Sequence, residues 1–167
     1  MLADQFTQTF RDEHRKIRDV LLDLIQAFKE RNGERIRTLL GQAAVYVGPH
    51  FRYEEEALYP ALVDIFGEEY IEQLLGDHDR AIGTAQRLIE FSEKDPLTDE
   101  DVQEATRLVR SVLPHVSDCD GLSIMVERLP EEKVQSILDA REHSIREGLD
   151  LLRWASEVRN RPTVAPE

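Results

Sequence analysis

Apolar residues recur every three or four positions along most of the chain, which is the spacing of amphipathic helices. Five such segments run from about 4–30, 34–66, 68–92, 98–128 and 131–159. Asn32-Gly33 ends the first segment, and Gly48-Pro49 predicts a kink inside the second. The pattern therefore predicts an all-α protein.

The helix boundaries divide the chain into a bundle and an addition to it. The fourth segment opens at Thr98 with the spacing of a capping box and passes through Pro114. We expect residues 1–128 to form a four-helix bundle and residues 129–159 to form a fifth helix packed on its outside. The apolar face expected to dock there consists of Val134, Leu138, Ile145, Leu149 and Leu152. Residues 160–167 are expected to be a flexible tail.

The amino-acid composition agrees with an all-α protein and limits the kinds of binding partner that we expect. Charged residues make up 33% of the chain, and Gly and Pro are few, as suits a helical protein. The formal net charge of −13 disfavours a nucleic acid or an anionic membrane as partner. The lone Cys119 excludes an intramolecular disulfide, and no basic leader or long apolar run is present. These features favour a cytoplasmic protein and leave its oligomeric state open.

Four of the five histidines form an internal repeat. His14 precedes His50 by 36 residues, and His78 precedes His115 by 37. The surroundings also match, because a carboxylate comes directly before His14 and His78, and a proline directly before His50 and His115. Two similar helical hairpins predict an up-down-up-down bundle with approximate two-fold symmetry.

At 100° per residue, all four of these histidines fall on the inward half of their helices. Glu54, one turn after His50, lies on the same apolar stripe, whereas the fifth histidine, His143, lies opposite its stripe and should be solvated. Burying four imidazoles and a carboxylate is costly unless a bound cation satisfies them. The sequence therefore predicts a metal site.

Imidazole and carboxylate donors suit zinc, iron, manganese and copper. A single tetrahedral zinc would need only the four histidines. Glu54 argues against that simple option, since a carboxylate one turn from His50 can bridge two metals.

The chain resembles the hemerythrin-like, or HHE cation-binding, domains over about residues 10–128. The motifs that carry the resemblance are His14, His50 through Glu54 (H-x-x-x-E), His78, and His115 through Asp120 (H-x-x-x-x-D). The resemblance implies an oxo- and carboxylate-bridged pair of iron ions, with manganese or zinc as alternative metals. One ion would be held by His14 and His50, the other by His78 and His115, with Glu54 and Asp120 bridging them.

Two positions depart from the family pattern. Ile82 stands where oxygen-carrying members have a further histidine, which weakens reversible O2 carriage and favours redox chemistry. The repeat also places Cys119, not an acid, opposite Glu54, and an unbroken helix would turn Asp120 away from the centre. A π-type bulge near Pro114 would bring Asp120 round. Asp120, Asp118 and Cys119 therefore all remain open as the residue that completes the site.

The expected function is binding or turnover of a small ligand, namely O2, NO or a peroxide, in a redox or nitrosative stress response. Alternatives are an iron or oxygen sensor without turnover, reversible O2 binding, and a bundle in which the histidines are only structural. Whether the protein is an enzyme stays open. Glu55 and Glu56 are interpreted as solvated, and Tyr53 and Tyr59 as packing residues.

Overall fold

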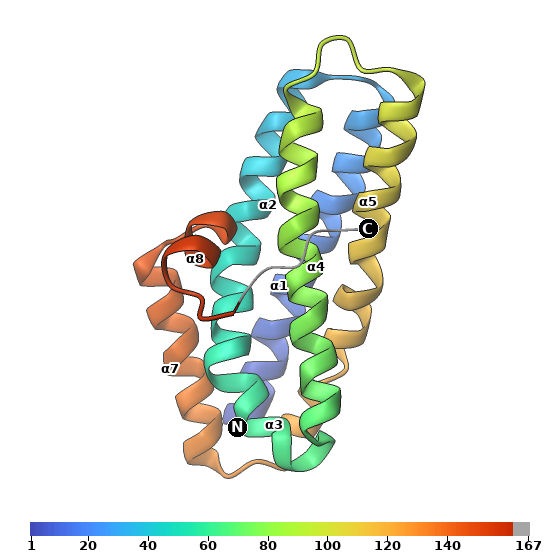
Figure 1. Ribbon diagram of the computed structural model, residues 1–167. Helices are drawn as coiled ribbons and strands as arrows, with labels where there is room; N and C mark the ends of the chain where they lie inside the picture. The colour runs from blue at the N-terminus through green and yellow to red at the C-terminus, as the bar shows by residue number, and fades with distance from the viewer. Residues whose placement is uncertain (162–167) are drawn as a thin grey trace.

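The computed structural model describes residues 1–161, and every regular element within that range is helical. The long helices are α1 (Leu2–Lys29), α2 (Gly33–Tyr53), α4 (Glu68–Ser92) and α5 (Asp99–Asp120). They lie side by side along one axis (Figure 1), with α1 and α4 each packed against both α2 and α5. The prediction of an all-α fold is confirmed, and each long helix turns one face toward a shared interior.

Local capping explains where two of these helices begin. The side chain of Asn32 accepts a hydrogen bond from the backbone N–H of Arg35 at the start of α2. Thr98 and Asp101 form a reciprocal capping box at the start of α5, as the sequence predicted. Both helices are therefore started by side chains that satisfy otherwise unpaired backbone donors.

The second predicted segment is interrupted in a different place from the one expected. Helix α2 continues through Gly48-Pro49, and the regular pattern changes at Glu54, where the π-helix η1 (Glu54–Leu58) begins. Helix α3 (Tyr59–Phe66) follows, and Gly67 turns the chain with φ +85°. The wider π turn allows two consecutive carboxylates, Glu54 and Glu55, to point toward the bundle.

The π-type bulge considered near Pro114 is not present. Helix α5 stays α-helical to Asp120, and the short helix α6 (Ser123–Val126) follows, so the fourth segment is not continuous to Arg128. Pro114 lacks an N–H and so removes one helical hydrogen bond, but it adds no residue to the turn. The orientations of Cys119 and Asp120 are therefore those of an ordinary helix.

The C-terminal segment forms two helices instead of one. Gly148, with φ +64°, ends α7 (Glu131–Glu147), and the Asp150 side chain caps α8 (Leu151–Glu157). Helix α7 packs beside α1 and α2, and α8 packs on α2 and α4 (Figure 1). Ile145, predicted to dock, is instead 47% exposed near the end of α7. Of the predicted tail, residues 162–167 lie outside the described residues.

Two apolar clusters fill the bundle, one on each side of a polar layer. One cluster is built around Leu21, Leu24 and Phe28, and the other around Phe6 and Phe10. The four repeat histidines occupy the layer between them. Within residues 1–161, no helix combines the length and the apolar character that a membrane span needs.

Candidate metal centre

The four histidines of the repeat converge in the middle of the bundle. His14 comes from α1, His50 from α2, His78 from α4 and His115 from α5, and none is more than 8% exposed. Glu54, the first residue of η1, is fully buried among them. The structure therefore brings together five of the six residues that the sequence singled out as ligands.

Glu54 is shared by two groups of potential ligands. Its Oε1 lies 3.5 Å from Nε2 of His50 and 3.3 Å from Nε2 of His78. His14, His50, Glu54 and Cys119 form one group, and Glu54, His78 and His115 form the other. Within each group the ligand atoms lie within 4.8 Å of one another. One carboxylate thus joins two histidine pairs, and each group offers donors that suit a metal ion.

The outer nitrogen of every histidine in the centre meets a carboxylate. The Nδ1-to-oxygen distances are 3.0 Å for His14 and Asp120, 3.4 Å for His50 and Glu13, 2.7 Å for His78 and Glu55, and 3.0 Å for His115 and Asp77. A ring that donates its Nδ1 proton to a carboxylate keeps a lone pair on Nε2. The outer carboxylates therefore direct four Nε2 lone pairs toward the interior.

The inner atoms lack the partners that burial demands. Nε2 of His14 lies 3.0 Å from Nε2 of His50, a contact that is favourable only while one of the two nitrogens carries a proton. Nε2 of His115 and Oε1 of Glu54 are buried without any hydrogen bond. Such orphaned acceptors cost free energy unless a cation satisfies them. The residues present therefore fit a bound metal.

The four outer carboxylates occupy equivalent positions in the two halves of the internal repeat. Glu13 and Asp77 directly precede His14 and His78, yet each bonds the histidine of the next long helix. The remaining two lie five residues after a histidine, Glu55 after His50 and Asp120 after His115. By position and by contact, Asp120 is thus the counterpart of Glu55, not of Glu54.

This equivalence corrects the predicted role of Asp120. Its side chain is 28% exposed and bonds Nδ1 of His14 from outside, so the structure does not place it as a bridge between the two halves. Asp118 is exposed, whereas Cys119 is fully buried beside Glu54. In α5 the residue four after His115, Cys119, faces the centre, and the residue five after it, Asp120, lies on the outer side, as Glu55 does after His50.

Arginines complete the outer layer. Arg11 and Arg80, from within the bundle, pair with Asp120 and Asp77. The other two come from the C-terminal segment, where Arg141 lies 3.2 Å from Glu13 and Arg159 lies 2.9 Å from Glu55. Outward from the centre, each histidine therefore bonds a carboxylate, and each of these carboxylates pairs with an arginine.

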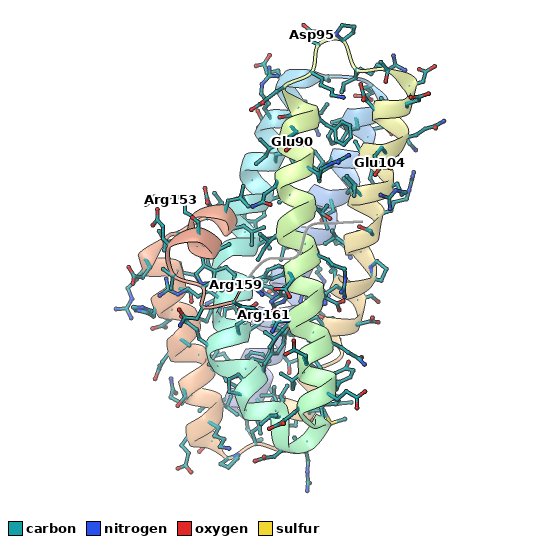
Figure 2. All side chains as sticks on the ribbon, in the orientation of Figure 1. Glu90, Asp95, Glu104, Arg153, Arg159 and Arg161 are labelled. Atoms are coloured by element: carbon teal, nitrogen blue, oxygen red, sulfur yellow. The ribbon has the colours of Figure 1, made fainter. Side chains whose placement is uncertain are left out.

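Arg159 is the most buried of these arginines, with its side chain only 1% exposed. It also pairs with Asp79 at 2.8 Å, while Arg161 bonds Asp79 and Glu72. Figure 2 shows Arg159 and Arg161 against the bundle, whereas Arg153 projects from the outer side of α8. The chain after α8 is thus held down by buried ion pairs.

The Arg159→Ala variant is expected to lose about 3 kcal/mol of unfolding free energy, because it leaves the buried Glu55 carboxylate without its arginine and Asp79 with Arg161 alone. Arg153→Ala is the control, since its pair with Glu157 is exposed and should change stability by less than about 0.5 kcal/mol. Urea denaturation of both variants measures the difference. Equal midpoints would contradict a structural role for Arg159.

The sequence did not predict the roles of several residues of the site. Glu55, predicted to be solvated, bonds His78, whereas Glu56 is exposed as predicted and pairs with Arg52. Glu13 and Asp77 were visible in the repeat as acids beside histidines, yet no role was given to them. The acid that directly precedes both His14 and His78 was the sequence signal that could have identified them.

The two tyrosines do more than pack. The Tyr53 hydroxyl donates to Glu13 and lies 3.3 Å from Nδ1 of His50. The Tyr59 hydroxyl lies 3.1 Å from Nε2 of His78, on the inner side of the ring. The fifth histidine, His143, is exposed and pairs with Glu147 away from the centre.

Ionisation of the metal-free centre follows from these contacts. Burial acts to lower the pKa of His50, but the carboxylates of Glu54 and Glu13 outweigh it and raise this pKa to about 10. Burial acts to raise the pKa of Glu54, yet His50 and His78 hold it well below its usual range. In the metal-free centre a protonated His50 and an ionised Glu54 therefore form a buried ion pair.

The stability of the metal-free protein should consequently depend on pH. Because the pKa of His50 is raised above its ordinary value of 6.5, its contribution is fully present below pH 6.5 and is lost as the pH rises toward about 10. The unfolding free energy should fall steadily over this window, and His50→Gln should flatten the slope. The exposed His143→Gln should keep it. Denaturation of apo-protein across this range measures the slopes, and identical slopes in all three proteins would contradict the assignment.

Comparison with known protein families gives a match over the part of the chain that holds the candidate metal centre. A family model, the hemerythrin HHE cation binding domain, matches residues 5–122. No curated protein and no solved structure matches the chain. The matched range contains all four histidines and Glu54, whereas Arg141 and Arg159 lie beyond it.

Proposed function

The chain belongs to the hemerythrin HHE cation-binding family, and from this premise we propose that it is a non-haem di-iron protein that binds or turns over O2, NO or a peroxide. One observation carries the proposal. Glu54 lies between two pairs of histidines whose inner nitrogens all face the same interior. An up-down-up-down bundle with α7 and α8 added to it would hold the two ions along its axis.

His14 and His50 would hold one ion, His78 and His115 the other, and Glu54 would touch both. Iron bound there would supply one-electron redox chemistry and coordination positions that a small ligand can occupy. Ile82, fully buried near this layer, supplies no further donor. Two histidines per ion therefore leave more exchangeable positions than a reversible O2 carrier needs.

The interior beside the centre suits a small ligand. A cavity of about 80 Å³ adjoins His14, His50 and His115, and most of its remaining wall is aliphatic, including Val47 and Ala85. An apolar cavity of this size tends to stay dry and to admit small uncharged molecules. It therefore favours a diatomic ligand or hydrogen peroxide over a larger organic substrate.

Tyr59 is placed to assist a bound ligand. Burial raises the pKa of Tyr59 well above its ordinary value, so its hydroxyl keeps its proton. That hydroxyl lies 3.1 Å from the inner nitrogen of His78 and can donate a hydrogen bond to a ligand in the centre. The outer carboxylates meanwhile hold the four rings in orientation.

The iron-loaded protein should contain about two irons per chain and show a charge-transfer band in the visible region that changes when NO or peroxide is added. Metal analysis and optical titration of the same sample measure both. A stoichiometry near zero, with no band after reconstitution, would contradict the proposal. Turnover of peroxide or NO, followed in the same sample, distinguishes a catalyst from a binding protein.

A second candidate function is iron or oxygen sensing without turnover. It is favoured by Arg141 and Arg159, which connect the C-terminal segment to the carboxylates that hold His50 and His78. Metal binding would then change how firmly this segment is docked. A melting temperature that rises strongly with iron, without peroxide or NO turnover, would support sensing. We also propose a cytoplasmic location and a role in redox or nitrosative stress.

A further inference from the structure

We propose that Cys119 is itself a metal ligand, so that the centre has a carboxylate donor in one half of the repeat and a thiolate in the other. The inference rests on the proposed metal centre but concerns a residue outside the family's histidine and carboxylate motif. It also assigns different numbers of protein donors to the two ions.

The internal repeat gives Cys119 its position. Glu54 lies four residues after His50, and Cys119 lies four residues after His115. Both side chains are fully buried. The residues that follow them, Glu55 and Asp120, also match, because each bonds Nδ1 of a histidine from outside. Cys119 is therefore the counterpart of the shared carboxylate.

The geometry places the sulfur within the ligand cluster. Sγ of Cys119 lies within 4.8 Å of the ligand atoms of His14, His50 and Glu54. It is 2.5 Å from Oε2 of Glu54 and 3.8 Å from the Tyr59 hydroxyl. A sulfur among three buried donors is placed as a fourth ligand to the ion held by His14 and His50.

Independent observations show that a cation belongs at this place. Oε1 of Glu54 and Nε2 of His115 are buried and have no hydrogen-bond partner. Glu54 belongs to the same ligand group as Cys119, and His115 belongs to the neighbouring group that shares Glu54. Helix α5 has no other inward donor near Cys119, since Asp118 is exposed and Asp120 bonds His14 from the outer side. The thiol is the only α5 group, besides His115, that can reach the ion.

The consequence is an asymmetric centre. Among residues 1–161, the ion beside Cys119 would have four protein donors, whereas the ion held by His78 and His115 would have Glu54 as its only other donor. A metal with three protein donors keeps an open position, and one with four can be closed. The small ligand is therefore expected at the ion held by His78 and His115, where His115 also lines the apolar cavity. On binding, the S–H bond is replaced by a metal–sulfur bond, and one proton is released to solvent.

Redox-silent metals test this without any activity assay. In the full-length protein loaded with zinc, X-ray absorption should show a sulfur neighbour at about 2.3 Å in addition to nitrogen and oxygen. In the protein loaded with Co(II), a near-ultraviolet thiolate charge-transfer band should appear. Cys119→Ser and Cys119→Ala should both lose the sulfur neighbour and the band. Ser111→Ala, on the same helix, removes a hydroxyl that bonds only the Leu108 carbonyl and should keep both.

The outcomes separate this inference from the proposed function. Metal bound to the unaltered protein through nitrogen and oxygen only would overturn the role of Cys119 and leave the proposed centre intact. In that case the thiol would merely donate a hydrogen bond to Glu54. No metal bound at all would overturn both. Because the sulfur neighbour is measured in the unaltered protein, the result does not depend on whether the variants fold.

Discussion

Replacing Glu54 with glutamine is expected to weaken metal binding by more than about 100-fold and to affect both ions together. Loss of an outer partner of a ligand already costs 10–100-fold in affinity, and Glu54 is an inner group shared by two ligand sets. Glutamine keeps the shape of the side chain but loses its charge, so the bundle should still form. Equilibrium dialysis against iron or zinc, followed by metal analysis, measures the change.

Glu56 provides a matched control two residues along the same π-helix. Its carboxylate is 43% exposed and pairs with Arg52, away from the ligand clusters. Glu56→Gln should therefore bind metal as the unaltered protein does. If Glu54→Gln lost one ion and kept the other at full affinity, Glu54 would not be shared, and the two halves of the centre would be independent.

The Gly48→Ala variant is expected to be destabilised by about 3 kcal/mol, the largest stability change that we predict outside the centre. A Cβ at position 48 would lie 2.6 Å from backbone atoms of Leu149, Asp150 and Leu151. These backbone atoms form the turn into α8 and cannot move aside as a flexible side chain can. The methyl group therefore pushes α8 away from α2 and loosens the chain that carries Arg159.

Gly41→Ala, on the same helix, is the control for this variant. A Cβ there meets nothing within 4 Å, and the position is exposed. Replacing an exposed helical glycine by alanine should stabilise the protein by about 1 kcal/mol. Urea midpoints should therefore move in opposite directions for the two variants. Equal shifts would show that α8 does not rest on Gly48.

Much of this arrangement could be predicted from the spacing of residues alone. The inward direction of His14, His50, His78 and His115 follows from helical periodicity, because each lies on or near an apolar stripe. The capping box at Thr98 likewise has a purely local cause. Features that depend on one helix were therefore accessible from the sequence.

Features that depend on the register between helices were not accessible. Glu13 bonds His50 and not its neighbour His14, which depends on how far α1 is shifted along α2. The π turn at Glu54 has no distinct sequence signal, and the π-type bulge considered near Pro114 does not occur. Arg159 reaches Glu55 only because the chain turns back after α8.

The most direct test of the account is a crystal structure of the iron-loaded protein with anomalous data at the iron edge. Two anomalous peaks are expected, about 3.5–4 Å apart. One should lie against the inner nitrogens of His14 and His50, the other against those of His78 and His115, with Glu54 touching both. A single peak, or peaks only at surface carboxylates, would contradict the two-metal centre.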